Sequence, residues 1–491
     1  MNSRFFASKT VSDYHPTIFS LSSKFGKSAI GVVRISGSQS LYVYHSLTRR
    51  SRLPKERIAS LRKLYSPESN VLLDEAITLY FKAPRTYTGE DILELYLHGG
   101  TAIIQSVLNS IKSLHNPSQG IHLRYAEKGE FSQRAFFNGK FDLTEIEGIR
   151  EMIDAETESQ RVSALASIKG DNKHQFLEWR TEIVNNIAFL TTLIDFGEEH
   201  DLEEVAGLLN SVDNNINNLR KEIIEYLTKV KGSTILMKGI KLILVGPPNA
   251  GKSSLLNSVT NKDAAIVSDI AGTTRDVIDI PIDINGYKII IGDTAGIRSE
   301  VFSDKIELEG VRRAKLRALG GDIILILIPL TDCQASDVST LVEQAKILKS
   351  NGKRVLLILN KEDLLSDNAK KEAVDFYSHQ FCLNLDEIHL VSCKNGKGIT
   401  FLLTSLTDMF KSITLSEVTD PISLSERAQD LLQNDVIYAF DQFKIFKELD
   451  DVVLASESLK QAADGIGKIT GEAIGLDEVL GVVFSNFCIG K

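Results

Sequence analysis

The pattern of apolar and polar positions divides the chain into regions of different secondary structure. From His15 to about Gln119, short apolar or alternating runs predict strands at Ala29–Ile35, Ala76–Phe81 and Ile92–Leu97. Turn residues separate these runs, and a helix is expected to open after the last of them. This first region therefore has the character of an α+β domain.

Helical spacing takes over after this region. Apolar residues recur every three or four positions, and the expected helices cover residues 131–138, 143–167, 172–196 and 213–231. The acidic run from Asp195 to Glu204 is expected to mark a solvated helix end. Helical periodicity returns from about Ser423 to Lys491.

Strands and helices alternate between these two helical regions, from about Lys238 to Phe410, which is typical of a parallel doubly wound sheet. Strands are expected at residues 242–245, 276–284, 287–291, 322–328, 354–359 and 387–391, with a hairpin turn at Asn285-Gly286. We therefore expect an α/β domain inserted into one discontinuous helical domain. The expected boundaries are residues 1–14 for a transit peptide, 15–130 for an N-terminal domain, 131–237 and 412–491 for the helical domain, and 238–411 for the inserted domain.

Composition narrows the classes of function. The net charge of −9 argues against a protein coated with basic residues for nucleic-acid binding, although it leaves room for a local basic face. The four cysteines, Cys333, Cys382, Cys393 and Cys488, include no C-x-x-C pair, which argues against a zinc site or a disulfide framework and favours a reducing compartment. No apolar run approaches the ~20 residues that a membrane helix needs.

Residues 1–14 have a composition of their own. Arg4 and Lys9 stand among serines and phenylalanines, and the segment holds one acidic residue, Asp13. That composition is similar to a short organellar transit peptide, which favours the mitochondrial matrix. The alternative is the frayed N-terminus of a cytoplasmic protein, as in a bacterium.

The strongest motif follows the first strand of the inserted domain. Gly246 and Gly251 frame four residues, and Lys252-Ser253 complete the pattern G-x-x-x-x-G-K-[ST]. In such a loop backbone N–H groups point at phosphate, the lysine meets the β- and γ-phosphates, and the serine hydroxyl holds Mg²⁺. The alternative, a glycine-rich turn without a ligand, is disfavoured by the apolar strand before the loop and the apolar-faced helix after it.

Four further segments identify the nucleotide. Asp293-Thr-Ala-Gly296 is expected to place a carboxylate near Mg²⁺, and Gly272-Thr-Thr-Arg-Asp276 offers a threonine for the same ion. In Asn360-Lys-Glu-Asp363 the carboxylate can accept hydrogen bonds from the N1–H and the 2-amine of guanine, and adenine lacks that amine. Ser392-Cys393-Lys394 is expected to support the base. Five ordered matches at strand ends predict a guanine nucleotide site.

The residues for hydrolysis differ from those of Ras-type GTPases. Ile297 follows Asp293-Thr-Ala-Gly296, and an isoleucine cannot orient an attacking water as a Ras-type glutamine does. Carboxylates that could do so are Glu300, Glu307 and Glu309. Asn249 could bind a monovalent cation beside the phosphates, or it could only brace the loop.

Segments outside the inserted domain identify a family. They are Ile30-Gly-Val-Val-Arg-Ile-Ser-Gly37, Tyr87-Thr-Gly-Glu-Asp-Ile-Leu-Glu94 with His98-Gly-Gly100, Gly129-Glu-Phe-Ser-Gln-Arg-Ala-Phe-Phe-Asn-Gly-Lys140, Ile194-Asp-Phe-Gly-Glu-Glu199, Ile469-Thr-Gly-Glu472 and the terminal Phe487-Cys-Ile-Gly-Lys491. With the nucleotide motifs, they make the chain similar to the MnmE (TrmE) family of tRNA-modification GTPases over nearly all of its length. Cys393 departs from the family pattern, which has alanine there.

The resemblance implies a fold of three parts: an α+β N-terminal domain that binds folate and mediates dimerisation, a discontinuous α-helical domain, and an inserted α/β P-loop GTPase domain of the Ras-like kind. Arg34, Glu94, Lys140 and Lys491 match positions that contact a 5-formyl- or 5,10-methylene-tetrahydrofolate. On sequence alone Arg34 and Glu94, charged residues inside apolar strands, could equally form an internal ion pair. Cys488 is a candidate for chemistry on tRNA, although a thiol without a nearby base is only weakly activated.

The resemblance also implies the roles of residues around GTP. It places K⁺ on Asn249, Ser268, Ile270 and Thr273, places Mg²⁺ on Ser253 and Thr274, and assigns Glu307 to orienting water. The implied GTP contacts are Asn249, Ala250, Gly251, Lys252, Ser253, Ser254, Ser268, Asp269, Ile270, Ala271, Gly272, Thr273, Thr274, Asp293, Thr294, Ala295, Gly296, Asn360, Lys361, Asp363, Ser392, Cys393 and Lys394.

The implied activity is a K⁺-stimulated GTPase that modifies C5 of the wobble uridine of tRNA with a carboxymethylaminomethyl or taurinomethyl group. Its implied partner is an FAD protein of the MnmG (GidA) type, and folate supplies the one-carbon unit. The rival hypothesis is a ribosome-assembly GTPase similar to Era or EngA, which shares the nucleotide motifs but not the flanking segments.

Overall fold

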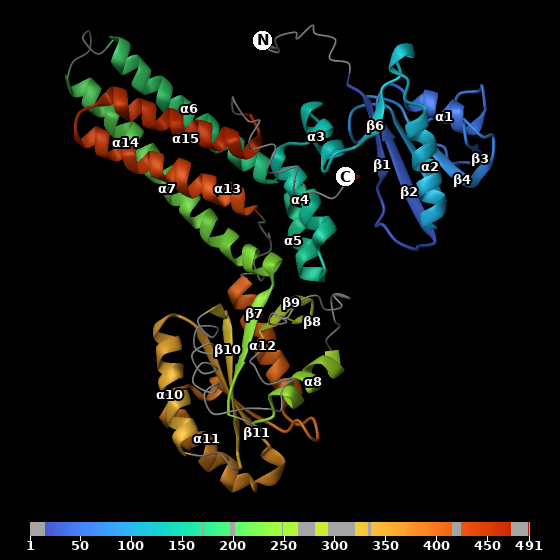
Figure 1. The fold of residues 1–491 in the computed structure, drawn as a ribbon. Helices are drawn as coiled ribbons and strands as arrows, with labels where there is room; N and C mark the ends of the chain where they lie inside the picture. The colour runs from blue at the N-terminus through green and yellow to red at the C-terminus, as the bar shows by residue number, and fades with distance from the viewer. Residues whose placement is uncertain are drawn as a thin grey trace, which may run out of the picture. The chain divides into compact units, whose positions relative to one another are not determined.

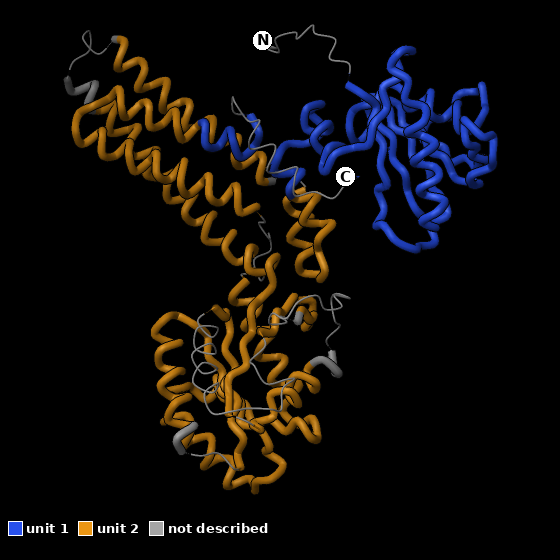
Figure 2. The backbone as a smooth tube through the Cα atoms, viewed as in Figure 1, with its two compact units in different colours: residues 1–147, 464–491 blue, residues 148–463 orange. Residues whose placement is uncertain are grey.

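The computed structural model describes residues 15–168, 171–196, 202–247, 249–263, 280–292, 320–331, 335–414, 424–472 and 490. Contacts divide the chain into two compact units, shown in Figure 2. One unit holds residues 1–147 and 464–491, and the other holds residues 148–463.

The first unit is built on a six-stranded sheet in the order β3-β4-β5-β2-β1-β6. Helices α1 and α2 cover one face of it, and their apolar side chains pack on Val33, Leu93 and Leu95. The expected strands are confirmed, and β1, β3 and β6 are additional. The bounds are β1 Thr17–Leu21, β2 Ile30–Ser36, α1 Ser40–Thr48, β3 Ser60–Tyr65, β4 Leu72–Phe81, β5 Ile92–His98, α2 Thr101–Ser113, β6 Leu123–Tyr125 and α3 Glu130–Phe137.

A residue from the far end of the chain completes this unit. The hydroxyl of Ser22 donates a hydrogen bond of 2.8 Å to the carbonyl oxygen of Gly490. Gly490 has φ +95°, and a Cβ there would lie 2.1 Å from the carbonyl oxygen of Leu21. Only glycine can lie so close to the backbone of Leu21. The hydrogen bond from Ser22 therefore fixes residue 490 beside the end of β1.

The helical domain is discontinuous, as expected. Segments before and after the α/β domain pack together: Arg220 of α7 pairs with Asp441 of α14 at 2.9 Å, and Lys447 pairs with Asp213 at 2.7 Å. The helices are α4 Leu143–Asp154, α5 Glu158–Ile168, α6 Asp171–Phe196, α7 Leu202–Lys238, α13 Glu426–Leu431, a π-helical turn Leu432–Ile437, α14 Tyr438–Glu448 and α15 Val452–Thr470.

One expected helix, over residues 143–167, is wrong because the structure has two helices there. Thr157 and Gln160 form a capping box: the Thr157 N–H donates to Gln160 Oε1 at 3.1 Å, and the Gln160 N–H points back at Thr157 Oγ1 at 3.5 Å. This cap starts α5 and separates it from α4. Helix α7 begins at Leu202 rather than Asp213 and is longer than expected.

The α/β domain has a second six-stranded sheet, in the order β12-β11-β10-β7-β9-β8. Only β8 is antiparallel to its neighbour, and helices flank the sheet, as Figure 1 shows. The elements are β7 Ile240–Val245, α8 Lys252–Asp263, β8 Ile280–Ile284, β9 Tyr287–Gly292, β10 Ile323–Pro329, α10 Ala335–Ser350, β11 Arg354–Asn360, α11 Asp367–Phe381, β12 Ile388–Val391 and α12 Ile399–Thr414. The expected parallel doubly wound sheet is confirmed.

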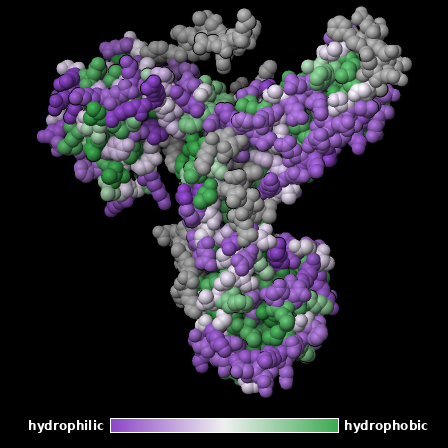
Figure 3. Space-filling view, turned by 180° about the vertical axis from the view of Figure 1, so that it is seen from behind, coloured by the Kyte–Doolittle hydropathy of each residue, from purple (hydrophilic) through white to green (hydrophobic). Residues whose placement is uncertain are grey.

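The surface reflects the amphipathic patterns of the sequence. In Figure 3 hydrophilic residues dominate the visible face of the helical domain, with hydrophobic residues showing between them. Among the described residues, no helix has both the length and the apolar character needed to cross a bilayer.

Candidate nucleotide-binding site

The phosphate loop extends from the carboxyl end of β7, a strand between two parallel neighbours. Its two framing glycines are required by close packing. A Cβ on Gly246 would lie 2.3 Å from the carbonyl oxygen of Leu327. Gly251 has φ +97°, and a Cβ on it would lie 2.2 Å from Nδ2 of Asn360. The loop can therefore approach its neighbours only with glycine at both positions.

Lys252, the first residue of α8, folds back over this loop. Its ammonium donates hydrogen bonds to the carbonyl oxygens of Gly246 at 2.7 Å and Pro247 at 2.9 Å. Burial lowers the pKa of Lys252, since the charged form loses hydration. The next residues, Ser253 and Ser254, are exposed, and Ala250 is buried. This arrangement leaves the Ser253 hydroxyl open at the start of the helix, where a phosphate-bound Mg²⁺ could reach it.

Asn360, at the carboxyl end of β11, joins the phosphate loop to the loops expected around the base. Its amide donates a buried hydrogen bond of 2.8 Å to the carbonyl oxygen of Ala250. Its Oδ1 accepts the N–H groups of Lys361 at 2.8 Å and Cys393 at 3.3 Å. One side chain thus fixes three of the segments that the sequence predicts to contact GTP.

Asp363 and Ser392 form the next link. The Ser392 hydroxyl donates to Asp363 Oδ1 at 2.6 Å. This hydrogen bond, with a smaller contribution from the positive charge of Lys394, holds the pKa of Asp363 below its usual range. The carboxylate is therefore ionised at neutral pH and can accept hydrogen bonds from a guanine edge. Lys361 takes a left-handed conformation with φ +66°, which turns the chain toward Asp363.

Cys393 lies in this loop as a partly buried thiol. Burial raises the pKa of Cys393, so the thiol stays neutral and has little nucleophilic character. Its backbone N–H, rather than its sulfur, makes the contact to Asn360. The thiol of Cys393 therefore adds no charge to this loop.

The remaining predicted residues lie outside the described part of the chain. They are Glu307, the alternatives Glu300 and Glu309, the segments Ser268–Thr274 and Asp293–Gly296, and Cys488 and Lys491. Asn249 is described: it is exposed and has φ +59°. The described half of the site thus comprises the phosphate loop and the base-side loops.

Arg34 and Glu94 lie opposite each other on β2 and β5 and form an ion pair of 2.9 Å. The Tyr96 hydroxyl donates to the other Glu94 oxygen at 2.9 Å. The Arg34 guanidinium also lies 5.5 Å from the ring centre of Tyr87 and 5.7 Å from that of Phe131. The internal ion pair is therefore present, and two aromatic side chains and the Tyr96 hydroxyl lie next to it.

Lys140, the third described folate candidate, donates a hydrogen bond to the carbonyl oxygen of Pro84. Its side chain also approaches Gly89, where a Cβ would lie 3.2 Å from Lys140 Cε. Tyr87 lies between Pro84 and Gly89 in sequence, and its ring lies near Arg34. The structure thus connects Lys140 to the Arg34–Glu94 pair through one turn of the chain.

Sequence reasoning missed a second charged network in this unit. Arg134 contacts Glu90 at 3.0 Å and Glu130 at 2.9 Å, and Arg124 contacts Glu130 at 2.6 Å. Glu130 and Arg134 are buried, and they stand four residues apart on α3. That spacing, inside an otherwise apolar helix face, is the signal that could have found the network.

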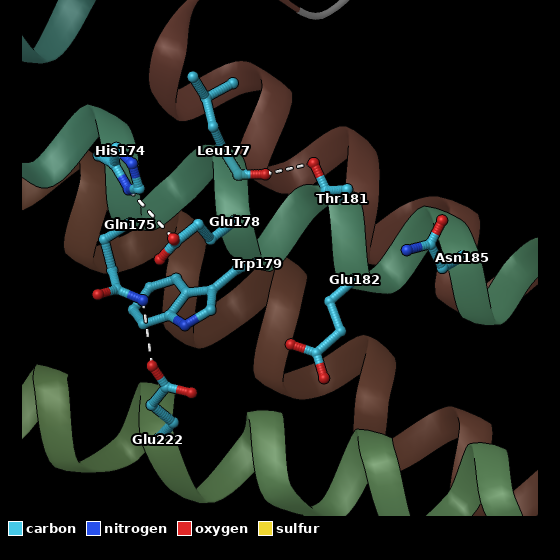
Figure 4. Close-up of a pocket in the computed structure, with 9 residues that line it drawn as sticks. All are labelled: His174, Gln175, Leu177, Glu178, Trp179, Thr181, Glu182, Asn185 and Glu222. Atoms are coloured by element: carbon cyan, nitrogen blue, oxygen red, sulfur yellow. Dashed lines mark hydrogen bonds and ion pairs between the residues drawn. The ribbon is translucent and has the colours of Figure 1, made fainter.

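A groove on the helical domain coincides with none of these residues. Figure 4 shows Glu178, Trp179 and Glu182 of α6 around it, with Glu222 of α7 opposite. Its volume is about 520 Å³. The Gln175 amide donates a hydrogen bond of 3.1 Å to the Glu222 carboxylate and so links α6 to α7 beside the groove. No group of three or more His, Cys, Asp or Glu side chains placed to hold a metal ion occurs in the described segments.

Comparison with known proteins agrees with the motifs. A family model described as "MnmE helical domain" matches residues 143–488, and one described as "GTP-binding protein TrmE N-terminus" matches residues 17–140. The Saccharomyces cerevisiae protein "tRNA modification GTPase MSS1, mitochondrial" is 46% identical over 494 residues, which cover 97% of this chain and 93% of that protein.

Two further relatives match along the same length. The human "5-taurinomethyluridine-[tRNA] synthase subunit GTPB3, mitochondrial" is 37% identical over 97% of this chain and 93% of its own length. The "tRNA modification GTPase MnmE" of Rickettsia bellii is 39% identical over 97% of this chain and 100% of its own length.

Proposed function

Because the chain belongs to the MnmE (TrmE) family of tRNA modification GTPases, we propose that it couples GTP hydrolysis to modification of C5 of the wobble uridine in tRNA. The observation that carries the proposal is a chain of hydrogen bonds from Ala250 through Asn360 to Cys393, and from the adjacent Ser392 to Asp363. It joins the phosphate loop to the carboxylate that we propose reads guanine. The family matches to residues 17–140 and 143–488 favour this function over that of an Era- or EngA-like ribosome-assembly GTPase.

In this proposal the α/β domain holds GTP through the phosphate loop, Lys252 and the base-side loops. The resemblance to the family supports Mg²⁺ at Ser253, whose hydroxyl is exposed, and at Thr274, and K⁺ at Asn249, Ser268, Ile270 and Thr273; of these only Ser253 and Asn249 lie in the described part of the chain. These cations, when bound, neutralise charge that develops on the phosphates. Glu307 orients the attacking water.

The catalytic assignment has a direct test. Glu307→Ala is expected to bind GTP with unchanged affinity and to hydrolyse it on the order of 100-fold more slowly, because only the orientation of water is lost. Stopped-flow binding and phosphate-release assays measure the two properties separately. Retained turnover would transfer the role to Glu300 or Glu309.

The N-terminal domain is proposed to bind a reduced folate at Arg34, Glu94, Lys140 and Lys491. The Arg34–Glu94 pair supports this assignment, because it offers both donors and acceptors to a pterin edge, and the nearby aromatic rings suit a flat ligand. The one-carbon unit of 5-formyl- or 5,10-methylene-tetrahydrofolate then supplies the new carbon at the uridine C5. Cys488 remains a candidate for this chemistry.

A titration separates the proposed function from its rival. Isothermal calorimetry of the folded protein with 5-formyl-tetrahydrofolate is expected to show binding that Arg34→Ala weakens at least ten-fold, because a charge-assisted contact is removed. An absence of binding would favour the ribosome-assembly function. Analysis of wobble uridines in tRNA from a deletion strain, with and without the Glu307→Ala gene, tests the complete proposal.

The proposed assembly is a homodimer that works with an FAD protein of the MnmG (GidA) type on tRNA. The proposed location is the mitochondrial matrix, since the similar yeast and human proteins are both named as mitochondrial. Location in the cytoplasm of a bacterium is the alternative, because a Rickettsia protein matches over the same length.

A further inference from the structure

Helix α5, part of the helical domain, contacts β9 of the α/β domain and also contacts α7, the helix that leads into β7. Its start lies beside the last turn of α7 and beside the turn of the β8–β9 hairpin. Helix α7 continues through Gly239 into β7 and the phosphate loop, and β9 ends directly before Asp293. One short helix therefore contacts the chain just before the amino-terminal ends of β7 and β9. Both strands lead to predicted phosphate contacts.

Gln160 makes the first of these attachments. It is 2% exposed, and its Nε2 donates to the carbonyl oxygens of Met237 at 2.9 Å and Leu236 at 3.3 Å. Carbonyls in the last turn of a helix lack partners within the helix, so this side chain satisfies groups that would otherwise need water. Its Oε1 accepts the N–H groups of Glu156 and Thr157. The start of α5 and the end of α7 are thus fixed to each other.

The hairpin makes the second attachment. The Glu156 carboxylate forms an ion pair with the Lys288 ammonium, and the two side chains are only 32% and 21% exposed. The Ser159 N–H donates to the carbonyl oxygen of Gly286 at 3.3 Å. Partial burial makes such a pair stronger than an exposed one, because water screens it less. The hairpin turn is therefore tied to the helical domain.

The two attachments act on neighbouring strands. β7 and β9 are parallel neighbours, with Ile240 beside Ile289 and Ile243 beside Gly292. A shift of β9 along β7 would move the segment that begins at Asp293 relative to the phosphate loop. We propose that Glu156, Gln160 and Lys288 are positioning residues for GTP hydrolysis: through α5 they set β9 against β7, and so make hydrolysis depend on the helical domain.

Steady-state GTP hydrolysis by the full chain tests this proposal. Glu156→Ala and Lys288→Ala are each expected to lower kcat about five-fold and to leave KM within two-fold, because the loops that hold the nucleotide are untouched. The double variant is expected to lose no more than either single variant, since the two residues act as one pair. Lys288→Arg, which keeps the charge, is expected to retain nearly the full kcat.

Glu158→Ala is the matched control. Glu158 begins the same helix and pairs with Arg161 of α5 rather than with the hairpin, so its removal is expected to leave kcat unchanged. Equal losses in Glu156→Ala and Glu158→Ala, or additive losses in the double variant, would overturn the proposal. Thermal unfolding of every variant excludes a general loss of folding, and Glu156→Gln keeps the side-chain shape if an alanine variant fails to fold. The readout is GTP hydrolysis alone, so the result is independent of the proposed tRNA modification.

Discussion

Asp363 shows what a single residue contributes to the nucleotide site. Its carboxylate is fixed by the Ser392 hydroxyl at 2.6 Å, and Lys394 adds a positive charge nearby. An ionised carboxylate accepts hydrogen bonds but cannot donate them, which suits the N1–H and 2-amine of guanine. We therefore propose that the choice of base depends on this one side chain.

We expect Asp363→Asn to change the preferred base from guanine to xanthine. An amide presents a donor to one side of the base, so it clashes with the guanine amine and suits the 2-oxo group of xanthine. GTP affinity is expected to fall on the order of 100-fold, equivalent to the loss of a charged hydrogen bond of about 3 kcal/mol, with a gain for XTP. Competition of GTP and XTP against a fluorescent nucleotide measures both changes. Unchanged preference for GTP would place the base elsewhere.

Single residues also show which features of the site can be predicted from the sequence. The phosphate loop and the segment around Asn360 could be predicted, because glycine spacing and polar residues at strand ends leave a pattern in the sequence. The bond from Asn360 to Ala250 could not, since it joins positions 110 residues apart. The sequence also leaves open whether Arg34 pairs with Glu94, because the two residues are far apart along the chain. The register of β2 and β5 places them opposite each other.

At the scale of elements, ion pairs of Glu130 and Arg134 attach α3 to the N-terminal sheet. Glu130 is buried, and burial alone would raise the pKa of its carboxyl. Hydrogen bonds from Arg124, from the Glu127 N–H and from Arg134 outweigh burial and lower that pKa below its usual value. The negative charge of Glu130 is thus favoured in the folded state.

This shift predicts how the stability of the N-terminal domain depends on pH. A lowered folded-state pKa contributes stability that is present above the unfolded pKa, near pH 4.5, and is lost as pH falls through the folded value. Glu130→Gln is expected to cost about 3 kcal/mol at pH 7, and the difference from wild type should shrink below about pH 4.5. Hydrogen exchange of N-terminal peptides suits this test, because the single tryptophan, Trp179, lies in the helical domain.

Glu158→Gln serves as the control for that measurement. Its partner Arg161 is exposed, so loss of the pair is expected to leave stability and its pH dependence nearly unchanged. A cost for Glu130→Gln that stays constant down to pH 3 would contradict the assignment of the shift to its arginine partners.

Elements also show why part of the fold escaped prediction. The strands of the α/β sheet are long apolar runs, and these were found. In strand β3 two charged residues, Arg62 and Lys63, separate Leu61 from Leu64, so apolar and polar positions do not alternate and the hydrophobic signal is weak. Pairing with β4 stabilises this strand. The break before α5 did have a signal, since Thr157-Glu-Ser-Gln160 matches a capping box. Continuous helical periodicity across residues 143–167 concealed it.

At the scale of the whole molecule, an exposed part of the N-terminal sheet bears on the proposed homodimer. Helices α1 and α2 cover one face of the sheet, and on the other face Phe131 of α3 packs on Ile18 of β1. On that second face, toward the β3 edge, Leu61 and Ile77 lie opposite each other on β3 and β4, and they are 59% and 45% exposed. Ile30 of β2 is 59% exposed. Apolar side chains of this size on paired strands form a surface that a second copy could cover.

We expect Ile77→Glu to shift the protein from dimer to monomer, because each copy would place a carboxylate in the apolar contact. Sedimentation velocity across a concentration series measures the change. Phe401→Glu is the matched control, since Phe401 lies on α12 of the α/β domain and is 69% exposed. A dimer that survives Ile77→Glu would place the contact on another surface.

The hydrogen bond between Ser22 and Gly490 has a consequence for folding during synthesis. These residues are 468 positions apart, so the ribosome adds Gly490 long after Ser22. The N-terminal sheet therefore gains this hydrogen bond only after residue 490 has been translated. A chain that terminates before residue 490 would lack this contact at the end of β1, which gives proteases a way to distinguish such products.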